Sequence, residues 1–173
     1  QDIFFKNSNI GYCILTIETQ ENTYIQKTTD GGLTWTWDEY QVPGVYRDLR
    51  SLFVTESGMI WVAGMEGNII VSNDGENYLE YLDLNNSEHK INSIFFIDEN
   101  VGWAAGEFNN GNFDGAVILR TTDGGKFWDT QNIAGHPYMS NSGIHNLYFI
   151  NSNYGWTIGA EGIFVTSDGG TTW

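Results

Sequence analysis

The sequence has few of the residues that several classes of protein require. Cys13 is the single cysteine among 173 residues, so neither a disulfide framework nor a cysteine-based metal site is expected. Seven Lys and Arg stand against 22 Asp and Glu, giving a net charge of −15, which argues against nucleic acids and anionic membranes as partners. The longest apolar runs have four or five residues, as at 94–97, and segments this short cannot span a bilayer.

Signals for helices and for targeting are also missing. No stretch keeps apolar residues at the i, i+3, i+4, i+7 spacing of an amphipathic helix. No basic segment precedes an apolar stretch, so no signal peptide is expected within the sequence. Aromatic residues, by contrast, make up 15% of the chain, and an intrinsically disordered chain is excluded for that reason. The length suits one domain with a core of its own.

Four copies of one unit account for nearly the whole sequence. Asp-Gly pairs recur at spacings of 44, 49 and 45 residues, and each follows a glycine-aromatic segment and an apolar segment. Repeats of this length indicate an array of similar supersecondary units. The predicted units cover residues 1–43, 44–88, 89–138 and 139–173.

Each unit predicts four short strands. In the third unit they are expected at 92–97, 102–106, 116–121 and 127–133, with a polar hairpin at 107–115. A period of about 40–50 residues that carries four strands is typical of β-propeller blades. Because one small sheet cannot bury both of its faces, the sheets must stack on one another. The predicted fold class is therefore all-β, a β-propeller of four-stranded antiparallel blades.

Three of the four Asp-Gly turns share a longer pattern. Residues 28–35 read Thr-Thr-Asp-Gly-Gly-Leu-Thr-Trp, and residues 166–173 read Thr-Ser-Asp-Gly-Gly-Thr-Thr-Trp. The third unit has Phe127 in place of the threonine, and the second, around Asp74, has no Trp. These turns resemble the Asp box, the bacterial neuraminidase repeat Ser/Thr-x-Asp-x-Gly-x-Thr-Trp. The whole unit resembles the propeller repeats of the photosystem II assembly and stability factor group.

The resemblance implies the fold but selects no single function, because related repeats also occur in sialidases, xyloglucanase-type glycoside hydrolases and sortilin-type receptors. In such turns Asp and Ser/Thr side chains cap backbone N–H groups, glycines accept positive φ, and the Trp wedges between sheets. We therefore interpret the turn residues as structural rather than catalytic, and Trp61, Trp103 and Trp156 as core. The predicted structural turn residues are Thr28, Asp30, Gly32, Trp35, Asp74, Asp123, Gly125, Trp128, Asp168, Gly170 and Trp173.

The ligand face is expected at the end of the sheets opposite the Asp-Gly turns, as in the families that the units resemble. Three of the units have an acidic residue followed by glycine in the predicted hairpin, at Glu66-Gly67, Asp114-Gly115 and Glu161-Gly162. These pairs predict a ring of carboxylates that would attract cations or a basic partner. The alternative is that they are only three hairpin turns. Loop aromatics suit sugar or peptide recognition, or pack onto neighbouring loops. The candidate ligand-binding residues are Tyr46, Arg47, Glu66, Phe108, Phe113, Asp114, His136, Tyr138 and Glu161.

No cofactor and no metal site is predicted. The three histidines share no ligand spacing, and neither a phosphate-binding loop nor a nucleophile elbow occurs. Calcium bound by oxygen-rich loops is the alternative, although no EF-hand spacing is present.

The favoured function is a non-enzymatic module that binds a protein or carbohydrate ligand, in a secreted or cell-surface protein, with the periplasm as the alternative location. The competing hypotheses are a fragment of a xyloglucanase-like or sialidase-like hydrolase and a structural spacer in an adhesin. A sialidase holds its substrate's carboxylate with three arginines. The chain has three in all, Arg47, Arg50 and Arg120, and Arg120 belongs to a predicted strand just before an Asp-Gly turn, which argues against a sialidase. No spacing singles out the pair of carboxylates that glycoside hydrolysis needs.

The two ends of the sequence do not fit a closed four-bladed ring. The first residues already belong to the first strand of unit one, and the last lie before the fourth strand of unit four. We therefore expect part of a larger propeller, completed by further blades of the same chain or by another chain. Neither nucleic acid binding nor membrane insertion is expected.

Overall fold

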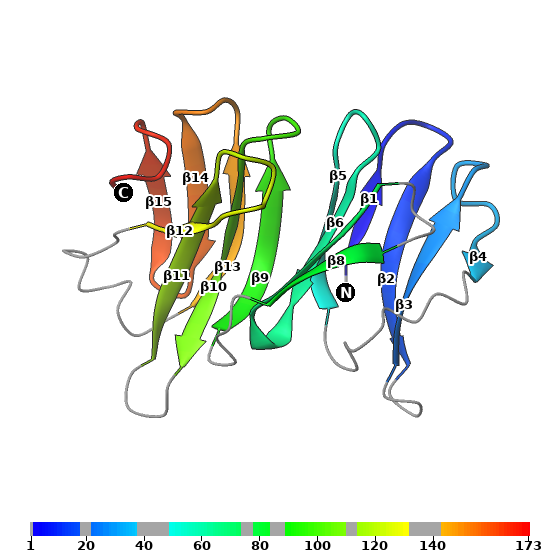
Figure 1. Cartoon of the computed structure of the whole chain (residues 1–173), viewed down its shortest axis with the longest axis horizontal. Coiled ribbons are helices and arrows are strands. Elements are labelled where there is room, and N and C mark those ends of the chain that lie inside the picture. Colours follow the sequence, from blue (N-terminus) through cyan, green and yellow to red (C-terminus); the bar gives the residue numbers. More distant parts are fainter. Residues whose placement is uncertain are drawn as a thin grey trace.

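The computed structural model describes residues 2–17, 22–37, 49–73, 78–83, 89–109, 114–131 and 143–173. These residues form four antiparallel sheets that stand side by side (Figure 1). In each sheet the strands follow one another in chain order. The described residues include one short 3-10 turn, η1 (Met65–Gly67). No helix among them is long and apolar enough to cross a membrane.

The four sheets follow one another along the chain. The first contains β1 (Ile3–Phe5), β2 (Gly11–Ile17), β3 (Asn22–Thr28) and β4 (Thr36–Trp37). The second contains β5 (Leu49–Val54), β6 (Ile60–Gly64), β7 (Asn68–Ser72) and β8 (Tyr78–Asp83). The third contains β9 (His89–Phe96), β10 (Gly102–Asn109), β11 (Asp114–Thr121) and β12 (Asp129–Thr130). The fourth contains β13 (Ile144–Phe149), β14 (Gly155–Gly159) and β15 (Gly162–Thr166), and the all-β prediction is confirmed.

The hairpin of the third sheet is shorter than the sequence suggests. Glu107 pairs with Ala116 on one side and Lys90 on the other, and Phe108 pairs with Gly115 and His89. These two residues extend β10 because neighbouring strands satisfy their backbone groups on both sides. The described residues of the polar hairpin predicted at 107–115, which are 107–109 and 114–115, therefore belong to strands.

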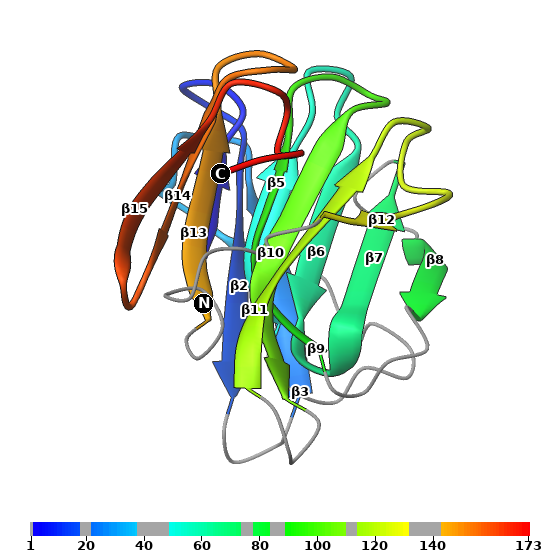
Figure 2. The same cartoon turned by 90° about the vertical axis from the view of Figure 1, so that its left-hand side faces the viewer.

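Successive sheets contact each other through their first strands. β1 lies against β5, β5 against β9, and β9 against β13. Viewed from the side, the sheets overlap as a stack (Figure 2). Every residue of β6 and β7 is buried, because the second sheet is covered on both faces. β13, in the last sheet, instead alternates between buried and exposed residues.

A tryptophan on the second strand joins the second sheet to the third, and another joins the third sheet to the fourth. Trp61 of β6 stacks on Phe96 of β9 with ring centroids 4.4 Å apart, and Trp103 of β10 stacks on Phe149 of β13 at 3.6 Å. The indole N–H of Trp103 also donates to the carbonyl of Gly169, 2.9 Å away. Both tryptophans are fully buried, as the sequence predicts. Such large aromatic side chains supply much of the apolar area buried between sheets.

The prediction for Trp156 is wrong. Its side chain is 38% exposed, although it occupies the position of Trp61 and Trp103 in the fourth sheet. The reason is that no described residue covers the outer face of β14. Cys13 is likewise only half-buried, and its thiol lies 3.7 Å from Oε1 of Gln26.

Three Asp-Gly turns have the same hydrogen bonds. In the first, the Thr28 hydroxyl donates to Asp30 and accepts the N–H of Gly32, while Asp30 accepts the N–H of Thr34 at 2.9 Å. The turns at 121–127 and 166–172 repeat these contacts at similar distances. The two glycines of each turn have φ between 71° and 97°, a region that glycine adopts without strain. Asp74, in the turn of the second sheet, lies outside the described residues.

The turn carboxylates are held in the ionised state by these donors. The hydroxyl and the N–H of Thr34 lower the pKa of Asp30 to about 2, and Thr172 does the same for Asp168. The pKa of Asp123 is lowered mainly by the N–H of Phe127. Each of these carboxylates accepts hydrogen bonds within its own turn. It is poorly suited to proton transfer at neutral pH, because it stays ionised and its oxygens already have hydrogen-bond donors.

We expect Asp30→Asn and Asp168→Asn to lower the melting temperature most at neutral pH. Because the folded pKa of each lies below the unfolded value of about 3.9, the stabilisation is complete above pH 5 and disappears as the pH falls toward 2. Circular dichroism melts between pH 7 and pH 2 measure the difference between variant and parent. A Glu56→Gln variant controls for loss of one exposed charge. A difference that stays constant over this range would contradict the role of the ionised carboxylate.

Phe127→Thr is expected to stabilise the third turn. Thr34 and Thr172 each donate a hydroxyl to the second carboxylate oxygen of their aspartate, at 2.5 and 2.6 Å, and Phe127 has no hydroxyl to give Asp123. Phe127 is also an exposed aromatic side chain that loses little packing when replaced. We expect a rise in melting temperature of about 1–4 °C. A Phe127→Val variant, similar in shape to Thr, should not show this rise.

Candidate functional site

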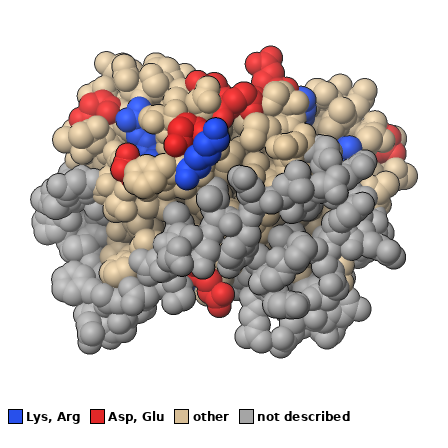
Figure 3. Space-filling view, viewed as in Figure 1, with Lys and Arg blue, Asp and Glu red and all other residues tan. Residues whose placement is uncertain are grey.

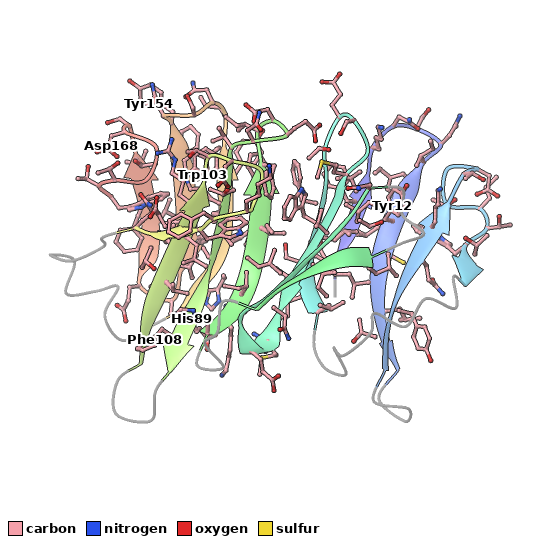
Figure 4. The ribbon with its side chains drawn as sticks, in the orientation of Figure 1. Tyr12, His89, Trp103, Phe108, Tyr154 and Asp168 are labelled. Carbon is pink, nitrogen blue, oxygen red and sulfur yellow. The ribbon has the colours of Figure 1, made fainter. Side chains whose placement is uncertain are left out.

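The two ends of the sheets carry different kinds of residue. The Asp-Gly turns lie at one end, and the connections between second and third strands lie at the other, here called the hairpin end (Figure 1). Figure 4 shows Asp168 and Tyr154 at the turn end and His89 with Phe108 toward the hairpin end. The turn end is occupied by the structural hydrogen bonds described above. The hairpin end is therefore the better candidate for a recognition surface.

The three predicted acidic-glycine pairs do not occupy one local position. Glu66 is exposed in η1 with φ of 61°, followed by Gly67 with φ of 69°. Glu161 is exposed in the two-residue loop between β14 and β15. Asp114 belongs to β11, where it pairs with Asn109 across the ladder. The backbone at Glu66 and Gly67 has the paired positive φ of a tight hairpin turn, which accounts for that pair without a ligand.

Phe108 is the one predicted aromatic whose side chain the structure describes. It is half-buried, and its ring lies 5.3 Å from the imidazole of His89 in an edge-on arrangement. It also packs against the buried cluster between the second and third sheets. Phe108 thus packs onto its neighbours and keeps part of its ring at the surface. Five predicted residues lie outside the described part of the chain: Tyr46, Arg47, Phe113, His136 and Tyr138.

Polar side chains of the second and third sheets meet a backbone carbonyl of the fourth sheet, close to the starts of the first strands. Arg50 of β5 donates through Nη1 to Oδ1 of Asn92 in β9, at 2.6 Å. Nδ2 of Asn92 donates to the carbonyl of Ile144 at the start of β13, 2.8 Å away, and lies 3.4 Å from Oε1 of Glu107. We call the group the inner-strand cluster; it comprises Arg50, Lys90, Asn92 and Glu107.

The inner-strand cluster contains both signs of charge at the surface. Nζ of Lys90 lies 3.6 Å from Oε2 of Glu107, and both side chains are about one-third exposed. An ion pair this exposed contributes little to folding stability, so its groups keep the capacity to bind a ligand. On the face shown in Figure 3, acidic and basic side chains of the described residues also lie close together at the turn end.

Sequence reasoning missed the inner-strand cluster. Arg50 and Asn92 are 42 residues apart, and Asn92 and Ile144 are 52 apart, so no short motif joins them. Only the repeat itself carries a signal, because Arg50 and Asn92 both lie near the beginning of a first strand. Among the described residues, no group of three or more His, Cys, Asp or Glu side chains could hold a metal ion.

The chain matches no protein-family model, and no curated protein matches it with significance. Solved structures do match. The chain is similar to YCF48 from Cyanidioschyzon merolae, with a TM-score of 0.68 and 19% identity over 97% of this chain and 50% of that chain. It is also similar to YCF48 bound to a D1 peptide, with a TM-score of 0.57 and 20% identity over 73% of this chain and 40% of that chain.

A third similar structure is the GH74 enzyme of Niastella koreensis, with 16% identity over 97% of this chain and 36% of that one. Its TM-score of 0.47 supports no functional argument. The chain spans half or less of the length of each of these three structures. At these identities the likeness shows the fold alone. The four antiparallel sheets have the arrangement of a β-propeller, related in fold to YCF48.

Proposed function

We propose that the chain is a non-enzymatic β-propeller module that binds a protein ligand at its hairpin end. The observation that carries the proposal is the inner-strand cluster, in which the second and third sheets place Arg50, Asn92 and Glu107 in contact at the surface. A peptide offers carbonyl, N–H and charged groups, which suit a site with donors and acceptors of both signs. One similar structure, of YCF48, has a D1 peptide bound, which supports this ligand class.

The cluster is organised before any ligand binds. Asn92 is held by Arg50 and by the carbonyl of Ile144, so its position is fixed by two neighbouring sheets. Half-buried Phe108 and His89 add an apolar surface at the same end of the third sheet, on its opposite face. A site that is ordered in advance loses less conformational entropy on binding. The net charge of −15 further favours a ligand with a basic segment.

We also infer that the three Asp-Gly turns are Asp boxes and that the repeat units are propeller blades, with four strands in each of the first three and three in the fourth. The support is the hydrogen-bond set shared by the turns at Asp30, Asp123 and Asp168. The secreted or cell-surface location stays a proposal that rests on composition. The hydrolase alternative gains no support from a described pair of carboxylates: Glu66 and Glu161 belong to the second and fourth sheets, with the third sheet between them.

Selection from a phage-displayed library of random twelve-residue peptides tests the proposed function. We expect selected peptides to carry Lys or Arg, and Glu107→Gln or Lys90→Ala to raise their dissociation constants at least about tenfold. Isothermal titration calorimetry gives these constants, and melting temperatures show that the variants remain folded. A glycan array run in parallel tests the carbohydrate alternative.

The matched control is Glu56→Gln, which removes one exposed carboxylate near the turn end. It should leave peptide affinity within about twofold of the parent, because a distant exposed charge is screened by salt. Equal losses for Glu56→Gln and Glu107→Gln would mean that only net charge matters, and the site would be wrong. Failure to select any peptide, together with binding on the glycan array, would replace the protein ligand with a glycan.

A further inference from the structure

The first strands of three successive sheets each carry a β-bulge at the same place. In the second sheet, the two residues that flank Arg50 in β5 pair with adjacent residues of β6, so Arg50 is the extra residue. The register shifts in the same way around Asn92 of β9 and around His145 of β13. A bulge bends its strand and re-aims the side chain of the extra residue. Arg50 and Asn92 are accordingly the residues that reach from one sheet to the next.

A glycine of the neighbouring strand makes room for the bulge at Asn92. A Cβ atom at Gly106 would overlap the carbonyl oxygen of Lys90, which the bulge brings against β10. The φ of Gly106 is not positive, so the position needs glycine for space rather than for its conformation. Gly64 and Gly159 lie beside the other two bulges. The direction of the Asn92 side chain is therefore set by the backbone of two strands.

A second glycine, in the next sheet, fixes the place of the Glu107 side chain. A Cβ atom at Gly143 would overlap Cγ of Glu107 and lie 2.9 Å from its Cδ. The acidic side chain thus lies across the backbone of residue 143, just before β13. Gly143 also has no positive φ, so its conformation is open to other residues. The contact that requires glycine here is the one with Glu107.

The carboxylate of Glu107 is held in place but lacks a short hydrogen bond. Oε1 lies 3.4 Å from Nδ2 of Asn92, and Oε2 lies 3.6 Å from Nζ of Lys90. Charge-assisted hydrogen bonds between N–H and carboxylate groups are ordinarily about 2.7–2.9 Å long. No described residue brings a donor closer, and about one-third of the side chain is exposed. Both oxygens therefore keep the capacity to accept hydrogen bonds from a ligand.

We propose that Glu107 receives a lysine or arginine side chain of the ligand, and that Gly143 and Asn92 are positioning residues that set this preference. The inference rests on the proposed function and adds the ligand group that is recognised. Ammonium and guanidinium groups bring several N–H donors to a carboxylate whose oxygens are weakly occupied. The third and fourth sheets together form the surroundings of Glu107. The charge of −15 draws a cationic ligand toward the chain.

Gly143 acts through Glu107 and needs no contact with the ligand. Alanine at this position pushes the acidic side chain away, because Cγ and Cδ of Glu107 are the atoms nearest to the new methyl group. The side chain is flexible and one-third exposed, so it moves while the sheets stay folded. A displaced carboxylate leaves Asn92 and Lys90 and loses more conformational entropy when it binds a cation. The preference for a basic ligand should therefore fall.

The test uses a lysine-containing peptide selected on the parent chain and the same peptide acetylated at that lysine. Acetylation removes the charge, and citrulline replaces arginine in the same way. The ratio of the two dissociation constants, from isothermal titration calorimetry, is the charge selectivity. We expect a ratio of at least about tenfold for the parent and about one for Glu107→Gln. For Gly143→Ala and Asn92→Ala we expect ratios at least about threefold below that of the parent.

Two controls separate positioning from stability. Gly11→Ala crowds the ring of Phe5, 2.8 Å from the new Cβ, at the turn end of the first sheet. It should leave the charge selectivity within about twofold of the parent even where it lowers the melting temperature, because distant sites act independently. Gly143→Ala added to Glu107→Gln should change the ratio no further, because it acts through the carboxylate. If Gly143→Ala does not fold, the ratio for Asn92→Ala decides whether the position of Glu107 sets the selectivity.

The outcomes distinguish this inference from the proposed function. Peptides that bind with a ratio unchanged by Gly143→Ala and Asn92→Ala would overturn the positioning role and leave the binding module intact. Equal losses for the lysine and acetyl-lysine peptides would mean that the variants only disturb the fold, which also contradicts the inference. Selected peptides without a basic residue would remove Glu107 as a cation receptor. A parent chain that binds no peptide would overturn the proposed function, and this inference with it.

Discussion

The burial of an aromatic side chain from one sheet against the next is the interaction on which the rest of this structure depends. A four-stranded antiparallel sheet has two faces, and neither becomes a core until a second sheet covers it. Trp61 and Trp103 satisfy this requirement by stacking on Phe96 and Phe149. The Asp-Gly turns serve the same contact, because they hold Trp128 and Trp173 edge-on to those phenylalanines. The hydrogen bonds of the turns and the packing of the core therefore support the same contact between sheets.

Because the turns position the stacked aromatic residues, the two ends of the sheets have different roles. At the turn end, Thr28, Asp30 and Gly32 bond to one another, and their polar groups have little left to offer a ligand. At the hairpin end the same constraint does not apply, because the connections there do not position the stacked aromatics. Polar residues such as Arg50 and Glu107 can therefore gather where the first strands of several sheets meet. The contacts that stabilise the fold therefore lie at the turn end of the strands, and the proposed recognition surface lies at the hairpin end.

The repeat pattern made most of the fold predictable, because the same residues mark the same element four times. The strands around Trp103 and the turn at Asp123 lie where the spacing places them. The extension of β10 to Asn109 could not be predicted, since it depends on partners for Glu107 on both sides. The inner-strand cluster was also out of reach, because residues 42 and 52 positions apart meet only once the stacking of three sheets is fixed.

Trp156 shows what a repeat can and cannot predict. Its position in the unit is that of a core residue, and a pattern that is read unit by unit assigns it to the core. Burial, however, belongs to the junction between two units, and a junction needs both partners. The exposure of Trp156 and of Phe5 therefore follows from one rule applied at the two ends of the stack. A large aromatic side chain can therefore be assigned to the core only once the sheet that covers it is known.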